Sequence, residues 1–153
     1  MSVRVGIAYD SHRLVEGREL ILGGVRIEHE LGLAGHSDAD VLTHAVIDAL
    51  LGAAGRGDIG EHFPDDDPRW EGADSIALLE AVVAELGARP LNVDATVICE
   101  RPKLGPHKAE MAARLTAAVG APVTVKATTN EGMGAIGRGE GIAALAVASV
   151  TAD

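Results

Sequence analysis

Cysteine and aromatic residues are almost absent from this chain of 153 residues. Cys99 is the single cysteine, so an internal disulfide cannot form, and we expect a reducing, cytoplasmic location. Aromatic residues make up 2% of the sequence, with one each of Tyr9, Phe63 and Trp70. This scarcity disfavours both the stacking of nucleic-acid bases and an aromatic belt at a membrane interface.

Positive charge and long apolar runs are also lacking. Lys and Arg number 13 against 23 Asp and Glu, which gives a formal net charge of −10 and disfavours a nucleic-acid surface. No apolar run approaches membrane-spanning length, and residues 1–6 lack the regions of a secretory signal, so we expect neither membrane insertion nor export. A phosphate ligand would therefore need local partners, such as metal ions, backbone N–H groups or a few placed cations.

Apolar residues are abundant, at 47% of a chain whose length suits one domain over residues 1–153. So high a share in a small domain indicates apolar surface buried against other subunits. Strand-like and helix-like segments alternate, which predicts an α/β sandwich with the helices on one face of the sheet. The expected strands are 3–9, 92–100, 123–128 and 142–151, with a hairpin of 19–22 and 25–27. The expected helices are 38–54, capped by Ser37 or Asp38; one from a Ser75 cap to Gly87; and one from Pro106 to near Gly120.

Two polar clusters point to a metal ion. Asp10 and His12 end the first predicted strand, where residues i and i+2 face the same side while Ser11 points away. His44 lies on the first predicted helix, in a polar stripe with Asp40 and Asp48. Asp10, His12 and His44 would leave a metal one open position, a pattern typical of catalytic zinc.

The same residues allow a second interpretation. Asp40, His44 and Asp48 could form a hydrogen-bonded network in the core, with His12 on the surface, and these residues alone support both about equally. The combination of an Asp-x-His pair with a histidine on a buried stripe favours the metal. In that case Asp48 or a backbone carbonyl would orient His44 through its second nitrogen.

Three further segments are candidates for phosphate contacts. Residues 132–137 match G-x-G-x-x-G, but a strand is expected to follow, so a dinucleotide-binding loop is rejected in favour of a glycine-rich turn. Its backbone N–H groups could instead hold an anion and a divalent ion, together with Thr128, Thr129, Glu131 and Arg138. Residues 100–106 are expected to form a turn with two cations, and residues 63–68 an acidic loop. Each by itself is typical of a surface segment.

Taken together, these segments resemble the family of 2-C-methyl-D-erythritol 2,4-cyclodiphosphate synthases of the non-mevalonate isoprenoid pathway. The resemblance covers nearly the whole chain in order, without large insertions. It is carried by residues 9–12, 36–40, 48–54, 57–60, 63–65, 92–94, 102–103, 125–129 and 137–141.

The resemblance implies an α/β fold with helices on a four-stranded sheet, a small added hairpin, and a homotrimer with active sites between neighbouring subunits. It implies that Asp10, His12 and His44 bind Zn²⁺ and that Glu131 binds a Mg²⁺ or Mn²⁺ ion that bridges the substrate diphosphate. His36 and Thr129 would stabilise the transition state. The implied contacts to the methylerythritol phosphate and the zinc region are Asp10, Ser11, His12, His36, Ser37, Asp58, Ile59, Gly60, Phe63, Pro64, Asp65, Asp66 and Asp67. The implied contacts to the cytidine diphosphate are Cys99, Glu100, Arg101, Pro102, Lys103, Leu104, Gly105, Thr128, Thr129, Asn130 and Glu131. Ala135 would be a further substrate contact, and Arg138 would contact a further phosphate or a central channel.

The implied reaction is an intramolecular phosphoryl transfer. The 2-phosphate of 4-diphosphocytidyl-2-C-methyl-D-erythritol 2-phosphate attacks the β-phosphate, the cyclic diphosphate forms and CMP leaves. Such chemistry needs positioning and charge neutralisation more than a protein nucleophile, and no convincing Ser/His/Asp arrangement or activated cysteine is present. Two positions depart from the family: Ala135 replaces a common aromatic residue, which would reduce its contact to the backbone, and Ala8 replaces a common glycine.

Two other functions fit the same residues. A zinc hydrolase of small phosphoesters would use the same ligands, with Asp38 or Asp40 as the general base for water. A non-enzymatic, metal-stabilised oligomer would close the zinc with a fourth ligand such as His36.

Overall fold

A five-stranded sheet forms the centre of the computed structural model, which describes residues 2–152. Its strands run in the order β4-β1-β7-β5-β6, antiparallel except for the parallel pair β5 and β6. Their bounds are β1 (Val3–Val15), β4 (Gly32–Leu33), β5 (Arg89–Ile98), β6 (Val123–Thr128) and β7 (Gly141–Thr151). The implied four-stranded sheet is thus corrected to five, because β1 extends to Val15 and its end pairs with the two residues of β4.

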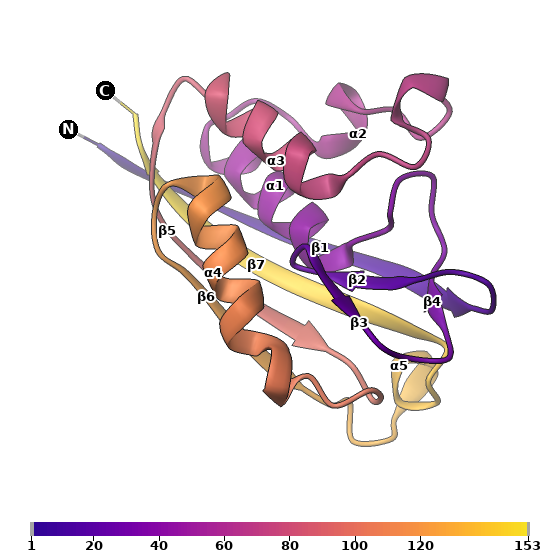
Figure 1. Ribbon diagram of the computed structural model, residues 1–153. Coiled ribbons are helices and arrows are strands. Elements are labelled where there is room, and N and C mark those ends of the chain that lie inside the picture. Colours follow the sequence, from indigo (N-terminus) through magenta and orange to yellow (C-terminus); the bar gives the residue numbers. More distant parts are fainter. Residues whose placement is uncertain (1, 153) are drawn as a thin grey trace.

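The expected hairpin is confirmed as a separate two-stranded sheet of β2 (Leu20–Leu22) and β3 (Val25–Ile27). Three long helices lie on one face of the main sheet, as expected (Figure 1). α1 (Val41–Ala53) packs on β1 and β7, α4 (Lys108–Val119) packs on β6, and α3 (Ser75–Ala84) packs on α1 and α4. The shorter helices are α2 (Ile59–His62) and α5 (Gly134–Gly137), with 3-10 turns η1 (Pro68–Trp70) and η2 (Gly105–His107).

The helix ends differ from the predicted ones where side chains compete for the cap. Asp40, rather than Ser37 or Asp38, caps α1 by accepting a hydrogen bond from the Thr43 backbone N–H. Asp74 caps α3, so that Ser75 is its first residue rather than its cap.

The end of α3 and the start of α4 also differ from the predicted residues. α3 ends at Ala84, three residues before the expected stop at Gly87. Pro106 lies in η2, and α4 itself begins two residues later, at Lys108. α4 ends as predicted at Gly120, whose left-handed φ of 77° closes the helix.

α1 is the buried centre of the fold, and Gly6 sets how closely it approaches the sheet. Within α1 only His44, Asp48 and Gly52 are not fully buried. A Cβ on Gly6 would run into the backbone of Ala49 and Ala53, so β1 and α1 can touch only because this position has no side chain.

The opposite face of the sheet exposes a row of apolar side chains. Along β1 the inward Gly6 and Ala8 alternate with exposed residues, as the two-residue repeat of a strand requires. The exposed large apolar side chains of this face are Val3, Val5, Ile7 and Tyr9 from β1 and Leu145 and Val147 from β7. Within residues 2–152, no helix or strand covers them. We name this surface the open sheet face.

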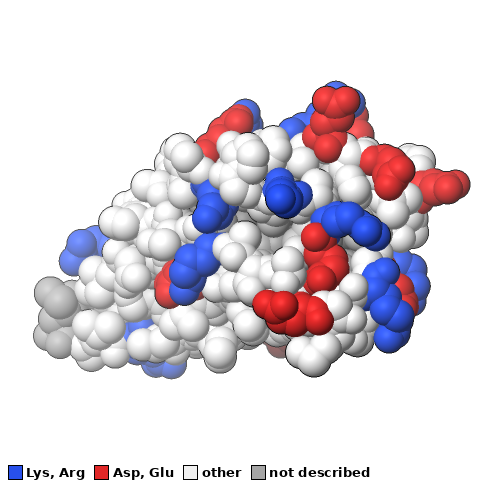
Figure 2. Space-filling model, turned by 90° about the horizontal axis from the view of Figure 1, so that it is seen from below, with Lys and Arg blue, Asp and Glu red and all other residues white. Residues whose placement is uncertain are grey.

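Charged side chains are interspersed over the surface seen from below. Figure 2 shows acidic and basic groups close to one another, with uncharged residues between them. This pattern differs from the single-sign patch expected for a nucleic-acid surface. Among residues 2–152, none of the helices is both long and apolar enough to cross a membrane.

Candidate functional site

β1 and α1 bring Asp10, His12 and His44 together. One ligand atom from each lies within 4.8 Å of the others. The Asp10 Oδ2 atom lies 3.0 Å from His12 Nε2 and 3.3 Å from His44 Nδ1, and the two imidazole rings meet edge to face. The predicted metal ligands therefore converge on one point and could hold a metal ion. We name them the triad.

The orientation of His12 is fixed by the backbone. Its Nδ1 donates a hydrogen bond of 2.8 Å to the carbonyl of Ala34. Because a carbonyl only accepts, Nδ1 carries the proton and Nε2 presents its lone pair to the triad.

The electrostatics of the triad suit a cation. Burial disfavours the charged imidazolium of His12, but the carboxylate of Asp10 outweighs burial and raises the pKa of His12. Burial likewise opposes the charge on Asp10, whereas hydrogen bonds from His12 and His44 lower its pKa to about 2. The carboxylate of Asp10 thus favours positive charge at this site, and a divalent ion could supply that charge.

Hydroxyl groups, and not Asp48, contact the second nitrogen of His44. The Nε2 atom lies 2.8 Å from Ser75 Oγ and 3.1 Å from Ser37 Oγ. Asp48 instead accepts a hydrogen bond from the backbone N–H of Ile59, so its predicted role toward His44 is wrong. Ser75 was missed as a site residue because it is 31 residues distant from His44 in sequence, and local pattern carries no signal of their contact.

Asp40 is turned away from the triad. Its fully buried carboxylate accepts hydrogen bonds from the backbone N–H groups of Gly23, Gly24 and Thr43 and from the Thr43 hydroxyl. Burial raises the pKa of Asp40 even so. Asp40 therefore ties the β2–β3 turn to α1 and is not free to act as a base.

A cavity of about 530 Å³ opens beside the triad. The predicted residues that line it with the triad are His36, Ser37, Ile59, Gly60, Phe63, Pro64, Asp65 and Asp66. Gly35, Trp70 and Leu78 also line it and were not predicted. The rings of Phe63 and Trp70 stand nearly perpendicular, with centroids 4.9 Å apart. His36 Nε2 donates to the carbonyl of Asp67 at 2.7 Å, and His36 is not part of the triad.

Three predicted residues of this region lie outside the cavity lining. Asp58 caps α2, and Asp67 caps η1 and pairs with Arg69 at 2.7 Å. The hydrogen-bonded guanidinium of Arg69 lowers the pKa of Asp67. Ser11 is exposed between Asp10 and His12, where the strand alternation turns it toward the open sheet face.

A second cavity of about 310 Å³ lies where β5 and β6 end. Its predicted lining residues are Cys99, Glu100, Pro102, Lys103, Leu104, Gly105, Thr128 and Thr129. The Glu100 carboxylate accepts hydrogen bonds from the backbone N–H groups of Asn130 and Gly132, which anchors the glycine-rich turn. Arg101, Asn130, Glu131, Ala135 and Arg138 were also predicted as substrate or phosphate contacts but do not line this cavity.

Cys99 remains a thiol. Burial raises its pKa to about 11, and its Sγ donates to the carbonyl of Arg101. A protonated, buried thiol is a poor nucleophile, so Cys99 is not an activated cysteine.

The two cavities do not merge within one chain. Asp10 lies in the same cross-strand row as Val97 of β5 and Ala127 of β6, with β7 between. At ~4.8 Å per strand, the ends of β5 and β6 are about 10–14 Å from Asp10. The cavities share no residue among their linings, and Glu131 is not part of the triad.

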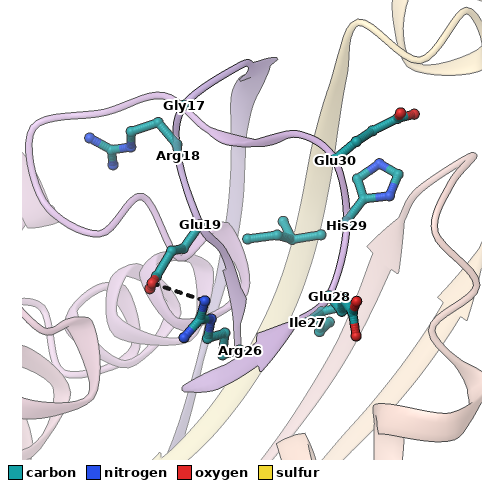
Figure 3. Close-up of a pocket in the computed structure, with 9 residues that line it drawn as sticks. Gly17, Arg18, Glu19, Arg26, Ile27, Glu28, His29 and Glu30 are labelled. Carbon is teal, nitrogen blue, oxygen red and sulfur yellow. Dashed lines mark ion pairs between the residues drawn. The ribbon is translucent and has the colours of Figure 1, made fainter.

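A further depression lies around the β2–β3 hairpin (Figure 3). Glu19 and Arg26 form an ion pair of 3.3 Å there, and His29 also lies on its wall. None of the predicted site residues lines it. Arg18 links this region to the triad cavity instead, because its guanidinium donates to the backbone carbonyls of Leu33, Gly35 and Ser37.

The fold and the site define a small α/β protein with a candidate three-ligand metal centre that opens into a cavity. The chain belongs to the YgbB family, whose model matches residues 3–151. It is 59% identical to the 2-C-methyl-D-erythritol 2,4-cyclodiphosphate synthase of Salinibacter ruber over 154 residues, which cover 97% of this chain and 98% of the relative.

Solved structures agree with this family. A cyclodiphosphate synthase in a CDP-bound form has a TM-score of 0.85 and 39% identity, covering 97% of this chain and all of that one. The bifunctional IspDF of Campylobacter jejuni has a TM-score of 0.93 and 39% identity, and the match covers 97% of this chain but 42% of that longer protein. These matches confirm the resemblance carried by the sequence motifs.

Proposed function

We propose that the protein converts 4-diphosphocytidyl-2-C-methyl-D-erythritol 2-phosphate into 2-C-methyl-D-erythritol 2,4-cyclodiphosphate and CMP, in isoprenoid precursor biosynthesis in the cytoplasm. The observation that carries this proposal is the convergence of Asp10, His12 and His44 beside an open cavity, in a chain of this family.

The triad fits Zn²⁺ because two imidazole nitrogens and one carboxylate oxygen are donors that this ion prefers. When bound there, the ion would supply a Lewis acid that withdraws charge from a phosphate oxygen. Glu131 would hold the Mg²⁺ or Mn²⁺ ion of the substrate diphosphate. Its left-handed φ of 53° and the Thr129 hydroxyl that accepts from its backbone N–H support a fixed turn at this position.

The side chains of the chain itself would position the substrate. His36, held through Nε2 by the Asp67 carbonyl, and Thr129 would stabilise the charge of the transition state. Phe63 and its neighbours would enclose the methylerythritol phosphate, and Lys103 would offset phosphate charge in the second cavity. Positioning and neutralisation suffice for an intramolecular phosphoryl transfer, so no protein nucleophile is required.

The active assembly would be a homotrimer in which the triad cavity of one subunit faces the β5–β6 cavity of its neighbour. Two observations support it. The open sheet face presents apolar side chains that water would otherwise solvate, and the two cavities stand apart within one chain.

The two other functions find less support. A hydrolase would need a free base, but both oxygens of Asp38 and of Asp40 already accept hydrogen bonds. A closed structural zinc would need a fourth ligand such as His36, but His36 is not among the side chains whose ligand atoms converge in the triad.

Incubation with the cytidylylated substrate, with and without a chelator, tests the proposal. We expect CMP release that the chelator abolishes, and a cyclic diphosphate in the phosphorus NMR spectrum. His44→Ala should lose zinc and turnover while the fold and the assembly remain, whereas the matched variant His29→Ala should retain both. CMP release that survives the chelator, or a product formed by net addition of water, would overturn the proposal.

A further inference from the structure

The second nitrogen of His44 begins a chain of hydrogen bonds that ends on a carboxylate. His44 Nε2 lies 2.8 Å from the hydroxyl of Ser75, and this hydroxyl in turn contacts Asp38 Oδ1. Ser75 is fully buried, so water does not compete for these contacts.

The direction of each hydrogen bond follows from the donors around Asp38. Its Oδ1 accepts from the Asp40 backbone N–H at 3.1 Å, and its Oδ2 accepts from the Ser75 backbone N–H at 3.0 Å. With N–H donors on both oxygens, Asp38 acts as an acceptor, and the Ser75 hydroxyl donates its proton to it.

The remaining lone pairs of Ser75 can only accept. The Nε2 atom of neutral His44 must therefore carry the ring proton, which leaves the lone pair on Nδ1, the atom that faces Asp10 at 3.3 Å. Ser37 Oγ, which accepts from the Ala39 backbone N–H, is a longer second acceptor for the same proton at 3.1 Å.

Backbone hydrogen bonds tie the segment that carries Asp38 to the segment that carries Ser75. The Asp38 backbone N–H donates to the Ala73 carbonyl, and the Gly72 backbone N–H donates to the His36 carbonyl. The segment around Asp38 is thereby joined to the start of α3, which carries Ser75. Rigid support of this kind lets an outer contact fix the geometry of a metal ligand.

We propose that Ser75 and Asp38 are positioning residues, which hold His44 in the tautomer and orientation that present Nδ1 to the metal of the triad. The proposal rests on the metal site of the proposed function. It differs from the case of His12, whose orientation depends on a backbone carbonyl that no substitution removes.

Zinc affinity, measured by competition with a chromogenic chelator, tests the role of Ser75 independently of turnover. Loss of an outer partner typically weakens metal binding about 10–100-fold, and we expect a loss in that range for Ser75→Ala. Ser37→Ala removes the longer contact to the same nitrogen and should cost less. Far-UV circular dichroism and thermal unfolding of each variant check that the fold is retained.

A second readout follows the proton itself. In zinc-loaded protein with ¹⁵N-labelled histidine, the His44 Nε2–H should be protected from exchange, and Ser75→Ala should remove this protection. If Ser75→Ala does not fold, Asp38→Asn replaces it, because it removes an acceptor oxygen beside the Ser75 hydroxyl and should also weaken zinc binding.

Wild-type zinc affinity together with a protected Nε2–H in the folded variant would overturn the positioning role. That result would leave the proposed function standing if the wild-type protein releases CMP in a chelator-sensitive way. Conversely, zinc binding that depends on Ser75 in a protein without CMP release would remove the proposed function and keep the positioning role.

Discussion

At the scale of single residues, the triad shows how two histidines on different elements can present different nitrogens to one point. His12 presents Nε2 because Nδ1 donates to the Ala34 carbonyl, whereas His44 presents Nδ1 and turns Nε2 toward Ser75. The carboxylate of Asp10 lies between the two histidines and interacts with both of them. Exchange of either tautomer would put an N–H where a lone pair is needed.

Asp10→Asn should lower the stability of the metal-free protein in one window of pH. The pKa of Asp10 is lowered to about 2, so its contribution is present above pH 3.8 and is lost as the pH falls through about 2. The pKa of His12 is raised above 6.5, so its contribution is complete below pH 6.5 and is lost as the pH rises through the raised value. Denaturant unfolding in the presence of a chelator should therefore show the largest difference from wild type between about pH 4 and 6.5, on the order of 1 kcal/mol. A difference that grows above pH 8 would contradict the argument.

At the scale of elements, the site depends on how α1 packs against β1 and the β2–β3 turn. Gly6 allows it to touch β1, and Asp40 caps it while holding the β2–β3 turn through Gly23 and Gly24. His44 lies in the first turn of α1, so both contacts affect the position of this member of the triad.

Gly6→Ala should separate α1 from β1. The new Cβ would overlap the backbone of Ala49 and Ala53, which cannot move as a side chain can, so we expect a loss of about 3 kcal/mol or more in the free energy of unfolding. Gly52→Ala is the matched control on the helix side of the same contact, because its Cβ would lie 3.8 Å from the Gly6 Cα. Because alanine favours the helix more than glycine does, Gly52→Ala should leave the free energy of unfolding unchanged or raise it by about 0.5–1 kcal/mol. Equal losses in the free energy of unfolding for the two variants, measured in urea, would contradict the close approach of α1 to β1 at Gly6.

Asp40→Ala should release the hairpin as well as the helix cap. It would leave buried N–H groups of Gly23 and Thr43 without partners, at about 1–3 kcal/mol each. Asp74→Ala, which removes the exposed cap of α3, should cost only about 1 kcal/mol. Hydrogen exchange should speed up in β2 and β3 for the first variant alone, and similar exchange in both variants would contradict the anchoring role.

Several elements were predictable because their evidence is local. β6 spans its predicted residues, and the β2–β3 hairpin follows from Gly23-Gly24 between two short apolar runs. Asp10 and His12 face one side because any strand places i and i+2 together. β1 was predicted too short because its extension to Val15 depends on pairing with β4 and with distant β7.

The contacts that sequence could not supply join distant segments. The Ser75 contact to His44 and the Ile59 contact to Asp48 form only when the loop after α1 folds back on it. Asp40 appeared to share a polar stripe with His44, but its hydrogen bonds to a hairpin some 16 residues earlier turn it elsewhere.

At the scale of the whole molecule, the open sheet face and the two separate cavities are the surfaces that further subunits could cover. The open sheet face presents apolar side chains, and each of the two cavities holds only part of the predicted substrate contacts. A closed cyclic assembly could complete both at once, because one symmetry operation brings the same pair of surfaces together at every interface.

Mixing two inactive variants tests whether sites are shared between subunits. His44→Ala removes a triad ligand, and Lys103→Ala removes the cation of the second cavity. After subunit exchange at equal amounts, about a quarter of the sites should combine an intact triad with an intact second cavity from the neighbour, and CMP release should recover to that extent. Light scattering should give the trimer mass before and after mixing. No recovery in a confirmed mixed assembly would contradict the shared site.

The alternation of side chains along β1 couples the position of the triad to that of the open sheet face. Asp10 and His12 face the helices while Tyr9 and Ser11, one position away, face the opposite side. Insertion of one residue within β1 would exchange the two sets, whereas insertion of two would preserve the sides. The triad and the open sheet face therefore cannot change sides independently, because a shift of register that displaces one also displaces the other.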